Sequence, residues 1–227
     1  MAQVESQAVR LSLQVSALAL AMLLPPATAI AYVLARYNFP GKNLVNGIAY
    51  LPLVLPPVVT GYLLLLTLST ESPVGAWLQD TFGIVFAFRW TGAALAAAIM
   101  GFPLAVQAIR LSIEAVDRRI EAAASTLGAN RAWIFMTITL PLILPGIIAG
   151  AILGFARALG EFGATITFVA NIRGETQTLP LAIYSLTQVP GKEIAALHLL
   201  IISVALALAA LVASEVLNRV ANKRLHG

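Results

Sequence analysis

The sequence predicts an all-α membrane protein with about five transmembrane helices, organised as a single domain over residues 1–227. Of its 227 residues, 59% are hydrophobic and only 11% are charged, with a mean hydropathy of +0.89. Soluble domains are far less apolar and carry more charge. In addition, five long apolar runs alternate with charged segments, and a bilayer core of ~30 Å is crossed by ~20 such residues in a helix.

Two further features of the composition narrow the function. The chain has no cysteine, which excludes disulfides, thiolate chemistry and cysteine metal sites. Its formal net charge is +4, but the basic residues are spread singly along the chain and form no stripe. This distribution is typical of membrane orientation signals and argues against nucleic-acid binding.

Two apolar runs in the first third of the chain each contain a pair of prolines. Residues 1–10 form a short polar leader without the features of a secretory signal, so we expect it to belong to the mature protein. The first span is expected at Leu11–Ala35, kinked at Pro25-Pro26, and the second at Leu44–Leu68, broken at Pro56-Pro57. Such pairs can be simple kinks or hinges of a moving pore lining, and the sequence leaves both open.

The next two spans are rich in small residues. Ser69–Trp90 is expected as a loop, followed by a third span at Thr91–Ile109 that Arg110 closes. The fourth span is expected at Trp133–Ala156. Small residues four apart allow helices to approach closely in lipid, within one subunit or across a two-fold dimer. The helix-packing residues expected on this basis are Gly146, Gly150 and Gly154.

The last part of the chain begins with pieces too short to cross a bilayer. Phe162–Val169 is apolar but short, and Leu179–Leu186 predicts another short helix. A fifth span is expected at Ile194–Leu217, followed by a basic tail over residues 218–227.

The segment between the third and fourth spans, about residues 112–131, predicts a helix, a turn and a second helix. Apolar residues at Val116, Ile120 and Leu127 recur at helical spacing, which favours a short amphipathic helix. Gly128 is a helix stop, and Asn130 is a suitable cap for a helix that starts at Arg131.

This segment resembles the cytoplasmic "EAA" loop of the permeases of bacterial ABC importers, which docks into a cleft of the ATPase subunit. The resemblance lies in Gly128, followed ten residues later by Ile138 and then by Leu140-Pro141. Glu121 lies one residue earlier than the family pattern places its glutamate, which leaves the role of this residue open. The resemblance implies an ATPase-coupling set that consists of Glu121, Ala122, Ala123, Ala124, Leu127, Gly128 and Ala129.

Longer stretches are similar to the molybdate ABC-transporter permeases, which are related to the sulfate and tungstate permeases. They are FPGK at Phe39–Lys42, LPLVLPPVVTGYLLL at Leu51–Leu65, RALGEFGATITFVANI at Arg157–Ile172 and GETQTLPLAIY at Gly174–Tyr184. The resemblance implies the ABC-importer permease fold and import of molybdate, with tungstate or sulfate as alternatives. It also implies a homodimer on two ATPase subunits that hold ATP and Mg²⁺, and a periplasmic molybdate-binding protein. No cofactor or metal is expected in this chain.

The basic residues predict the orientation in the inner membrane. With the N-terminus outside, five spans place nine of the 14 lysines and arginines in cytoplasmic segments and five outside. The positive-inside rule therefore favours an outer N-terminus and a cytoplasmic C-terminus. This orientation places the loop around Gly128 in the cytoplasm, where an ATPase can reach it.

Neutral hydrogen-bond donors are expected along the transport pathway, because a transport site must release its anion. The candidates are Thr165, Thr167 and Asn171. The alternative is that the threonine hydroxyls bond to their own helix. For Glu161, we expect a structural pair with Arg157, or contact with the binding protein, in preference to direct ligation of a dianion.

Two other classes of protein were compared with the transporter. An intramembrane enzyme could use Glu161 and His198, but the spans hold no HExxH motif, no paired aspartates and no Ser-Lys constellation. His198 is more typical of an interfacial histidine than of a metal ligand. A channel that works without ATP is the third possibility, and copurification of an ATPase would separate it from a transporter.

Overall fold

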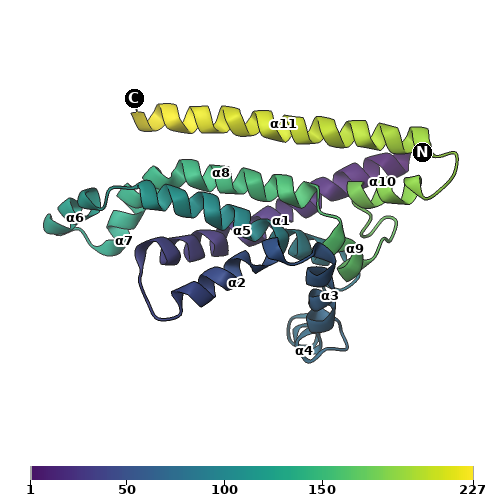
Figure 1. The fold of residues 1–227 in the computed structure, drawn as a ribbon, viewed down its shortest axis with the longest axis horizontal. Coiled ribbons are helices and arrows are strands. Elements are labelled where there is room, and N and C mark those ends of the chain that lie inside the picture. The colour runs from purple at the N-terminus through teal and green to yellow at the C-terminus, as the bar shows by residue number, and fades with distance from the viewer. Residues whose placement is uncertain (1, 227) are drawn as a thin grey trace.

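The computed structural model describes the backbone of residues 2–226 and the side chains of residues 6–210 and 212. Within this range every regular element is a helix (Figure 1). The helices are α1 (Ala2–Arg36), α2 (Lys42–Val54), α3 (Pro57–Leu68), α4 (Pro73–Phe82), α5 (Trp90–Ala115), α6 (Arg118–Thr126), α7 (Arg131–Ile134), a π-helical turn (Phe135–Thr139), α8 (Leu140–Leu159), α9 (Gly163–Val169), α10 (Leu179–Thr187) and α11 (Glu193–His226).

The number of membrane-crossing helices agrees with the prediction. Four helices are long and apolar enough to cross a membrane: α1, α5, the run from Arg131 to Leu159, and α11. A fifth crossing results if α2 and α3, which meet at an angle of 113°, together make one span. The predicted all-α membrane fold with about five spans is therefore confirmed.

The two proline pairs behave differently. α1 continues through Pro25 and Pro26, whereas α2 stops at Val54 and α3 starts only at Pro57. Leu55 and Pro56 are extended there, with ψ angles of 140° and 135°, as is usual for residues that precede a proline. α1 packs along α5 and α8, so neighbouring helices support its backbone. The second pair is thus a sharp break.

Three boundaries differ from those predicted. The segment expected as a polar leader continues α1 as far back as Ala2, and the expected loop Ser69–Trp90 contains α4. The third span ends at Ala115 and not at Arg110. There the Arg110 side chain donates to Glu114 Oε1, one turn later, over 2.8 Å, and this pair supports the added turns.

The core is formed by α1, α5 and α8, with α5 most deeply enclosed. Ala93, Ala97 and Ala105 of α5 are completely buried, and larger side chains such as Ile109 fill the space between them. Small residues along one helix let its neighbours approach closely, which is how helices associate in lipid. α5 is therefore the central helix of the bundle.

The three glycines of α8 lie against α5 and α1. A Cβ atom at Gly146 would overlap the Ser112 side chain, while one at Gly150 would lie 3.0 Å from Ile109 Cγ1. A Cβ at Gly154 would lie 3.1 Å from Leu23 of α1. All three glycines are buried within this chain, so their close contacts are made inside the subunit.

We expect Gly146→Ala to lower the stability of the protein by about 1–3 kcal/mol, because the added methyl group has no room beside Ser112. The measurement is the thermal unfolding of the purified protein. Gly47→Ala is the matched control, since nothing lies within 4 Å of a Cβ at this position of α2. Equal behaviour of the two variants would contradict the packing argument.

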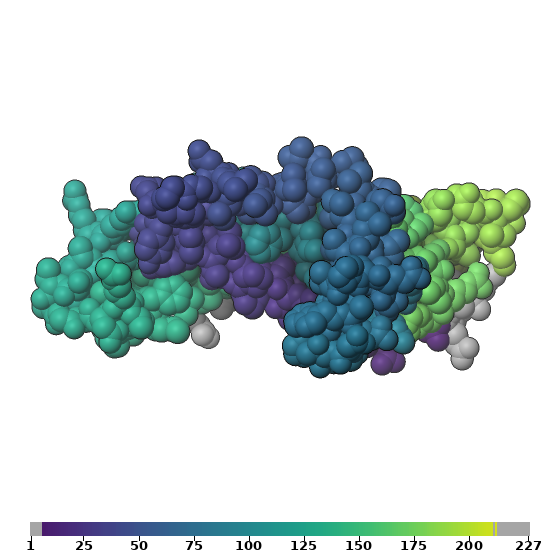
Figure 2. All heavy atoms as spheres, turned by 90° about the horizontal axis from the view of Figure 1, so that it is seen from below, coloured from purple at the N-terminus to yellow at the C-terminus, as the bar shows by residue number. Residues whose placement is uncertain are grey.

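Short helices gather at two opposite ends of the molecule. α6 and α7 lie at the same end of the molecule as the C-terminal end of α11, whereas the N-terminus, α9 and α10 lie at the other (Figure 1). The bent pair α2 and α3, together with α4, covers one face of the molecule (Figure 2). Apolar residues of this face, among them Leu44, Ile48 and Val54, are exposed.

Candidate functional site

The helix α6 is a short surface helix with a defined cap at each end. Asp117 caps its first turn by accepting a hydrogen bond from the Arg119 amide over 2.9 Å. At its other end the Gly128 amide donates to Ser125 O and the Ala129 amide donates to Ala124 O. This pair of bonds is a Schellman motif, and Gly128 adopts the left-handed conformation it requires, with φ of +87°.

The predicted second helix is present but irregular. Asn130 caps α7, as predicted, by accepting a hydrogen bond from the Trp133 amide over 2.8 Å. A π-helical turn, Phe135–Thr139, then joins α7 to α8. Such turns inside a continuous helix are frequently found at functional sites. α6, α7 and the π-turn contact one another at the start of the fourth span, and Figure 1 shows α6 and α7 side by side there.

Glu121 connects this unit to the rest of the bundle. Its Oε1 atom accepts hydrogen bonds from Arg36 Nη2 at the end of α1 and from Thr139 Oγ1 in the π-turn, both over 2.7 Å. The Arg36 side chain is only 8% exposed and that of Glu121 is 21% exposed. We call this three-residue contact the Arg36–Glu121–Thr139 latch. It ties α6 to two membrane helices.

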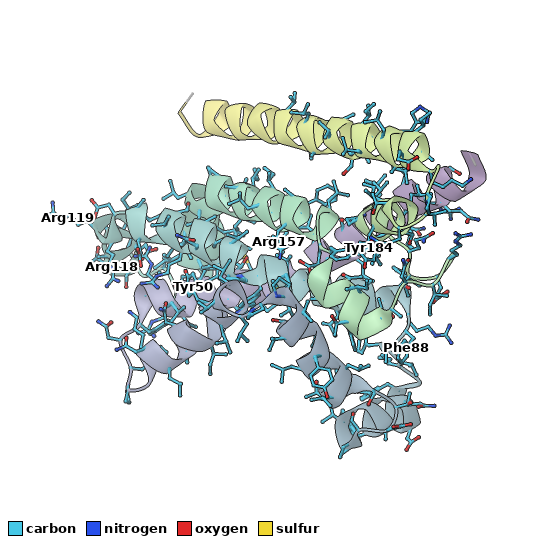
Figure 3. The ribbon with its side chains drawn as sticks, turned by 45° about the vertical axis from the view of Figure 1, so that its right-hand side comes forward. Tyr50, Phe88, Arg118, Arg119, Arg157 and Tyr184 are labelled. Carbon is cyan, nitrogen blue, oxygen red and sulfur yellow. The ribbon has the colours of Figure 1, made fainter. Side chains whose placement is uncertain are left out.

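Apart from Glu121 and Arg118, whose Nη2 donates to Ala35 O of α1 over 3.2 Å, α6 lies mainly on the surface. No residue of α6 is buried, and the apolar Ile120 and Leu127 are 47% and 88% exposed. The apolar side chains of this amphipathic segment therefore lie on the surface, whereas the acidic Glu121 points toward the bundle. Ala122 and Ala123 lie exposed on the same helix, and Ala124 is half-buried. Arg118 and Arg119 extend from this end of the molecule (Figure 3).

The partners of Glu121 could not be found from local spacing. Arg36 is 85 residues away and Thr139 is 18 residues away in the sequence. The sequence contained one signal. Glu121 is a lone glutamate before three alanines, and Arg36 is an arginine at the end of the first span.

A second polar site lies at the other end of the fourth span. Arg157 of α8 and Glu161 form the ion pair expected from their spacing. Glu161 is 2% exposed, and its Oε1 also accepts a hydrogen bond from the Ala164 amide over 2.8 Å. Glu161 thus satisfies a free amide in the first turn of α9 and fixes the start of this helix. Arg157 points toward this region in Figure 3.

We expect Glu161→Gln to destabilise the protein by about 1–2 kcal/mol, because the charged acceptor is replaced by a weaker neutral one. The glutamine can still accept from the Ala164 amide. Thermal unfolding measures the loss, with Glu175→Gln as the control. Glu175 pairs with Arg89 over 3.9 Å on the exposed surface, where ion pairs contribute little. A larger effect at Glu175 would contradict this account.

The predicted pathway residues lie on and just after α9. Thr165 is buried, and Thr167 donates its hydroxyl to Gly163 O over 2.9 Å, as in the helix-bonded alternative. Asn171 donates to Ser185 Oγ over 2.6 Å and accepts from Gln177 Nε2 over 3.1 Å. These bonds hold the α9–α10 connection in place, and the assignment of the three residues to the pathway stays a prediction.

The arrangement of these helices is that of the membrane subunits of bacterial ABC transporters. A bacterial ABC transporter involved in the import of the acidic polysaccharide alginate has a TM-score of 0.74 to this chain at 20% identity, covering 94% of this chain and 78% of its own. Residues 27–225 match the model of the binding-protein-dependent transport system inner membrane component. The chain belongs to this family.

Two curated relatives place it within the family. The molybdenum transport system permease protein ModB of Escherichia coli K12 is 58% identical, over 97% of this chain and 96% of its own length. The sulfate transport system permease protein CysT of the same organism is 37% identical, over 68% of this chain and 56% of its own length.

Proposed function

We propose that this chain is the membrane permease subunit of an ATP-driven importer for molybdate. The observation that carries the proposal is the 58% identity to the E. coli molybdenum permease over almost the whole of both chains. The sulfate permease matches at lower identity over a shorter stretch, so sulfate is less well supported as a substrate. The chain itself moves the anion, and ATP is hydrolysed on a separate partner subunit.

The exposed surface of α6 is the proposed docking site for this ATPase. Leu127 is 88% exposed beside the Schellman turn and is not covered by any of the described residues, which supports a protein contact at this leucine. The coupling set proposed from the resemblance, Glu121 to Ala124 and Leu127 to Ala129, spans this surface. Within the set, Glu121 acts inward, through the Arg36–Glu121–Thr139 latch.

Transport by alternating access follows from this arrangement. ATP binding changes the conformation of the ATPase pair only through a difference in binding free energy between two states. A movement of α6 would displace α1 and the π-turn, because the latch bonds α6 to both, and the π-turn is continuous with α8. The outcome proposed is a pathway that opens alternately to the outside and to the cytoplasm.

The proposed assembly has two copies of this chain, two ATPase subunits and a periplasmic molybdate-binding protein. α6 and the C-terminal end of α11 lie at one end of the molecule (Figure 1), which suits a cytoplasmic C-terminus and an outer N-terminus. The exposed apolar face of α2 and α3 supports a contact with the second copy or with lipid.

The test is reconstitution of the chain with its neighbouring ATPase and the cognate binding protein in proteoliposomes. We expect molybdate-loaded binding protein to stimulate ATP hydrolysis and to drive uptake of molybdate. Tungstate and sulfate are tested in parallel. Uptake that prefers sulfate would replace the proposed substrate, and uptake without ATP would indicate a channel.

A further inference from the structure

A groove follows α1 on the side that faces α8. It has a volume of about 710 Å³ and is lined mainly by apolar groups. Leu24, Thr28 and Tyr32 lie at successive turns of α1 along it, and Phe135 and Ile147 line the opposite side. The stretch from Leu24 to Tyr32 extends over about 12 Å of helix, so the groove is long enough for part of a hydrocarbon chain. We call it the α1–α8 groove.

A basic pocket of about 380 Å³ continues the groove at the end that carries α6. The two cavities share Tyr32, Tyr37, Arg131 and Phe135 in their walls. Three arginines and one glutamate line the basic pocket: Arg36, Arg118, Arg131 and Glu121. Because a single carboxylate faces three guanidinium groups, the pocket has an excess of two positive charges.

The latch does not use all of the donors in this pocket. The Arg36 side chain is only 8% exposed, yet its Nε atom is buried without a hydrogen-bond partner. In addition, Arg131 forms no ion pair within the part of the chain that the structure describes. A buried guanidinium donor that lacks a partner carries an energetic penalty, which an anionic ligand would remove.

We propose that the α1–α8 groove and the basic pocket together bind one anionic phospholipid. An acyl chain would lie along Leu24 and Ile147, and the phosphate would lie among Arg36, Arg118 and Arg131. The two tyrosines at the junction suit the headgroup level, where amphipathic aromatic rings gather. Basic pockets between transmembrane helices on the cytoplasmic side are a known chemical setting for anionic headgroups.

An apolar groove that continues into a basic pocket favours a lipid over other occupants. A small inorganic anion would fill the basic pocket but leave the apolar groove empty. A zwitterionic lipid would bring an ammonium group close to three arginines. The bound phosphate would lie beside the Arg36–Glu121–Thr139 latch and would supply the negative charge that the pocket lacks.

The test is native mass spectrometry of the full chain, purified in mild detergent with its copurifying partners. Phosphatidylglycerol and phosphatidylethanolamine with the same acyl chains serve as probes. We expect retention of one phosphatidylglycerol in preference to phosphatidylethanolamine. Arg131→Gln should weaken this retention about fivefold, on the scale of one basic residue at an anionic membrane surface.

A second variant tests the groove without a change of charge. Ala29 is exposed and lines the groove, so Ala29→Trp should fill it and displace the acyl chain. Arg119→Gln and Ala21→Trp are the matched controls, because both residues are exposed and line neither cavity. Retention should be unchanged in these controls.

Equal retention of the two lipids, or equal losses in test and control variants, would overturn the proposal by showing a general lipid shell. Retention of free phosphate alone would show an ion site and would also overturn it. The measurement involves neither ATP nor molybdate. Its failure is therefore distinct from failure of the proposed transport function.

Discussion

Gly128→Val should abolish ATP-driven uptake in reconstituted vesicles while leaving the membrane helices folded. Gly128 has a φ of +87°, and nothing lies within 4 Å of a Cβ built at this position. The obstacle to a side chain is thus the backbone conformation and not a lack of space. A β-branched residue in this left-handed region costs about 1–3 kcal/mol, which the exposed turn can avoid by opening its Schellman motif.

An open turn would no longer hold Leu127 and α6 in the orientation that the ATPase meets. We therefore expect ATP hydrolysis to continue, or to change its dependence on the binding protein, without uptake. Gly128→Asn is the control, because asparagine tolerates the left-handed conformation far better than valine. It should keep most of the uptake. Wild-type coupling in Gly128→Val would remove this turn from the coupling site.

Much of the fold was predictable because lipid imposes strong constraints on a sequence. Apolar runs of sufficient length must be helices in a bilayer. Four of the five predicted spans are present as long helices, and the second is the bent pair α2 and α3. The Gly128 stop and the Asn130 cap are local backbone chemistry, so their positions could also be predicted. The expected kink at Pro25-Pro26 and break at Pro56-Pro57 agree with a continuous α1 and with the separation of α2 from α3, whereas the sequence left open whether either pair is a hinge.

The contacts of the site depend on tertiary structure and could not be predicted in the same way. The amphipathic spacing did not indicate which side of α6 faces the bundle: Glu121 pairs with Arg36, whereas Ile120 and Leu127 are exposed. A residue 85 positions away leaves no periodic signal.

Glu121→Ala should destabilise the isolated permease and also abolish ATP-driven uptake. Glu121 is the carboxylate that pairs with Arg36, and among the described residues no other carboxylate lines the basic pocket. The Arg36 side chain is 8% exposed. Removing one member of a fully buried ion pair costs about 3–5 kcal/mol, because the other charge is left without compensation. Glu121 is 21% exposed, so we expect a loss below that range. The measurements are thermal unfolding of the permease alone and uptake in the full assembly.

The result separates two roles for Glu121. If its carboxylate contacted only the ATPase, Glu121→Ala would leave the unfolding of the isolated permease unchanged. If it holds the latch, the double variant Arg36→Leu with Glu121→Ala should recover most of the lost stability, since removal of both charges leaves none unpaired. Uptake should stay low in the double variant, because α6 is still released from α1. Recovery of stability together with uptake would show that the ion pair serves folding alone, whereas recovery of stability without uptake identifies the Arg36–Glu121–Thr139 latch as the link through which α6 moves the bundle.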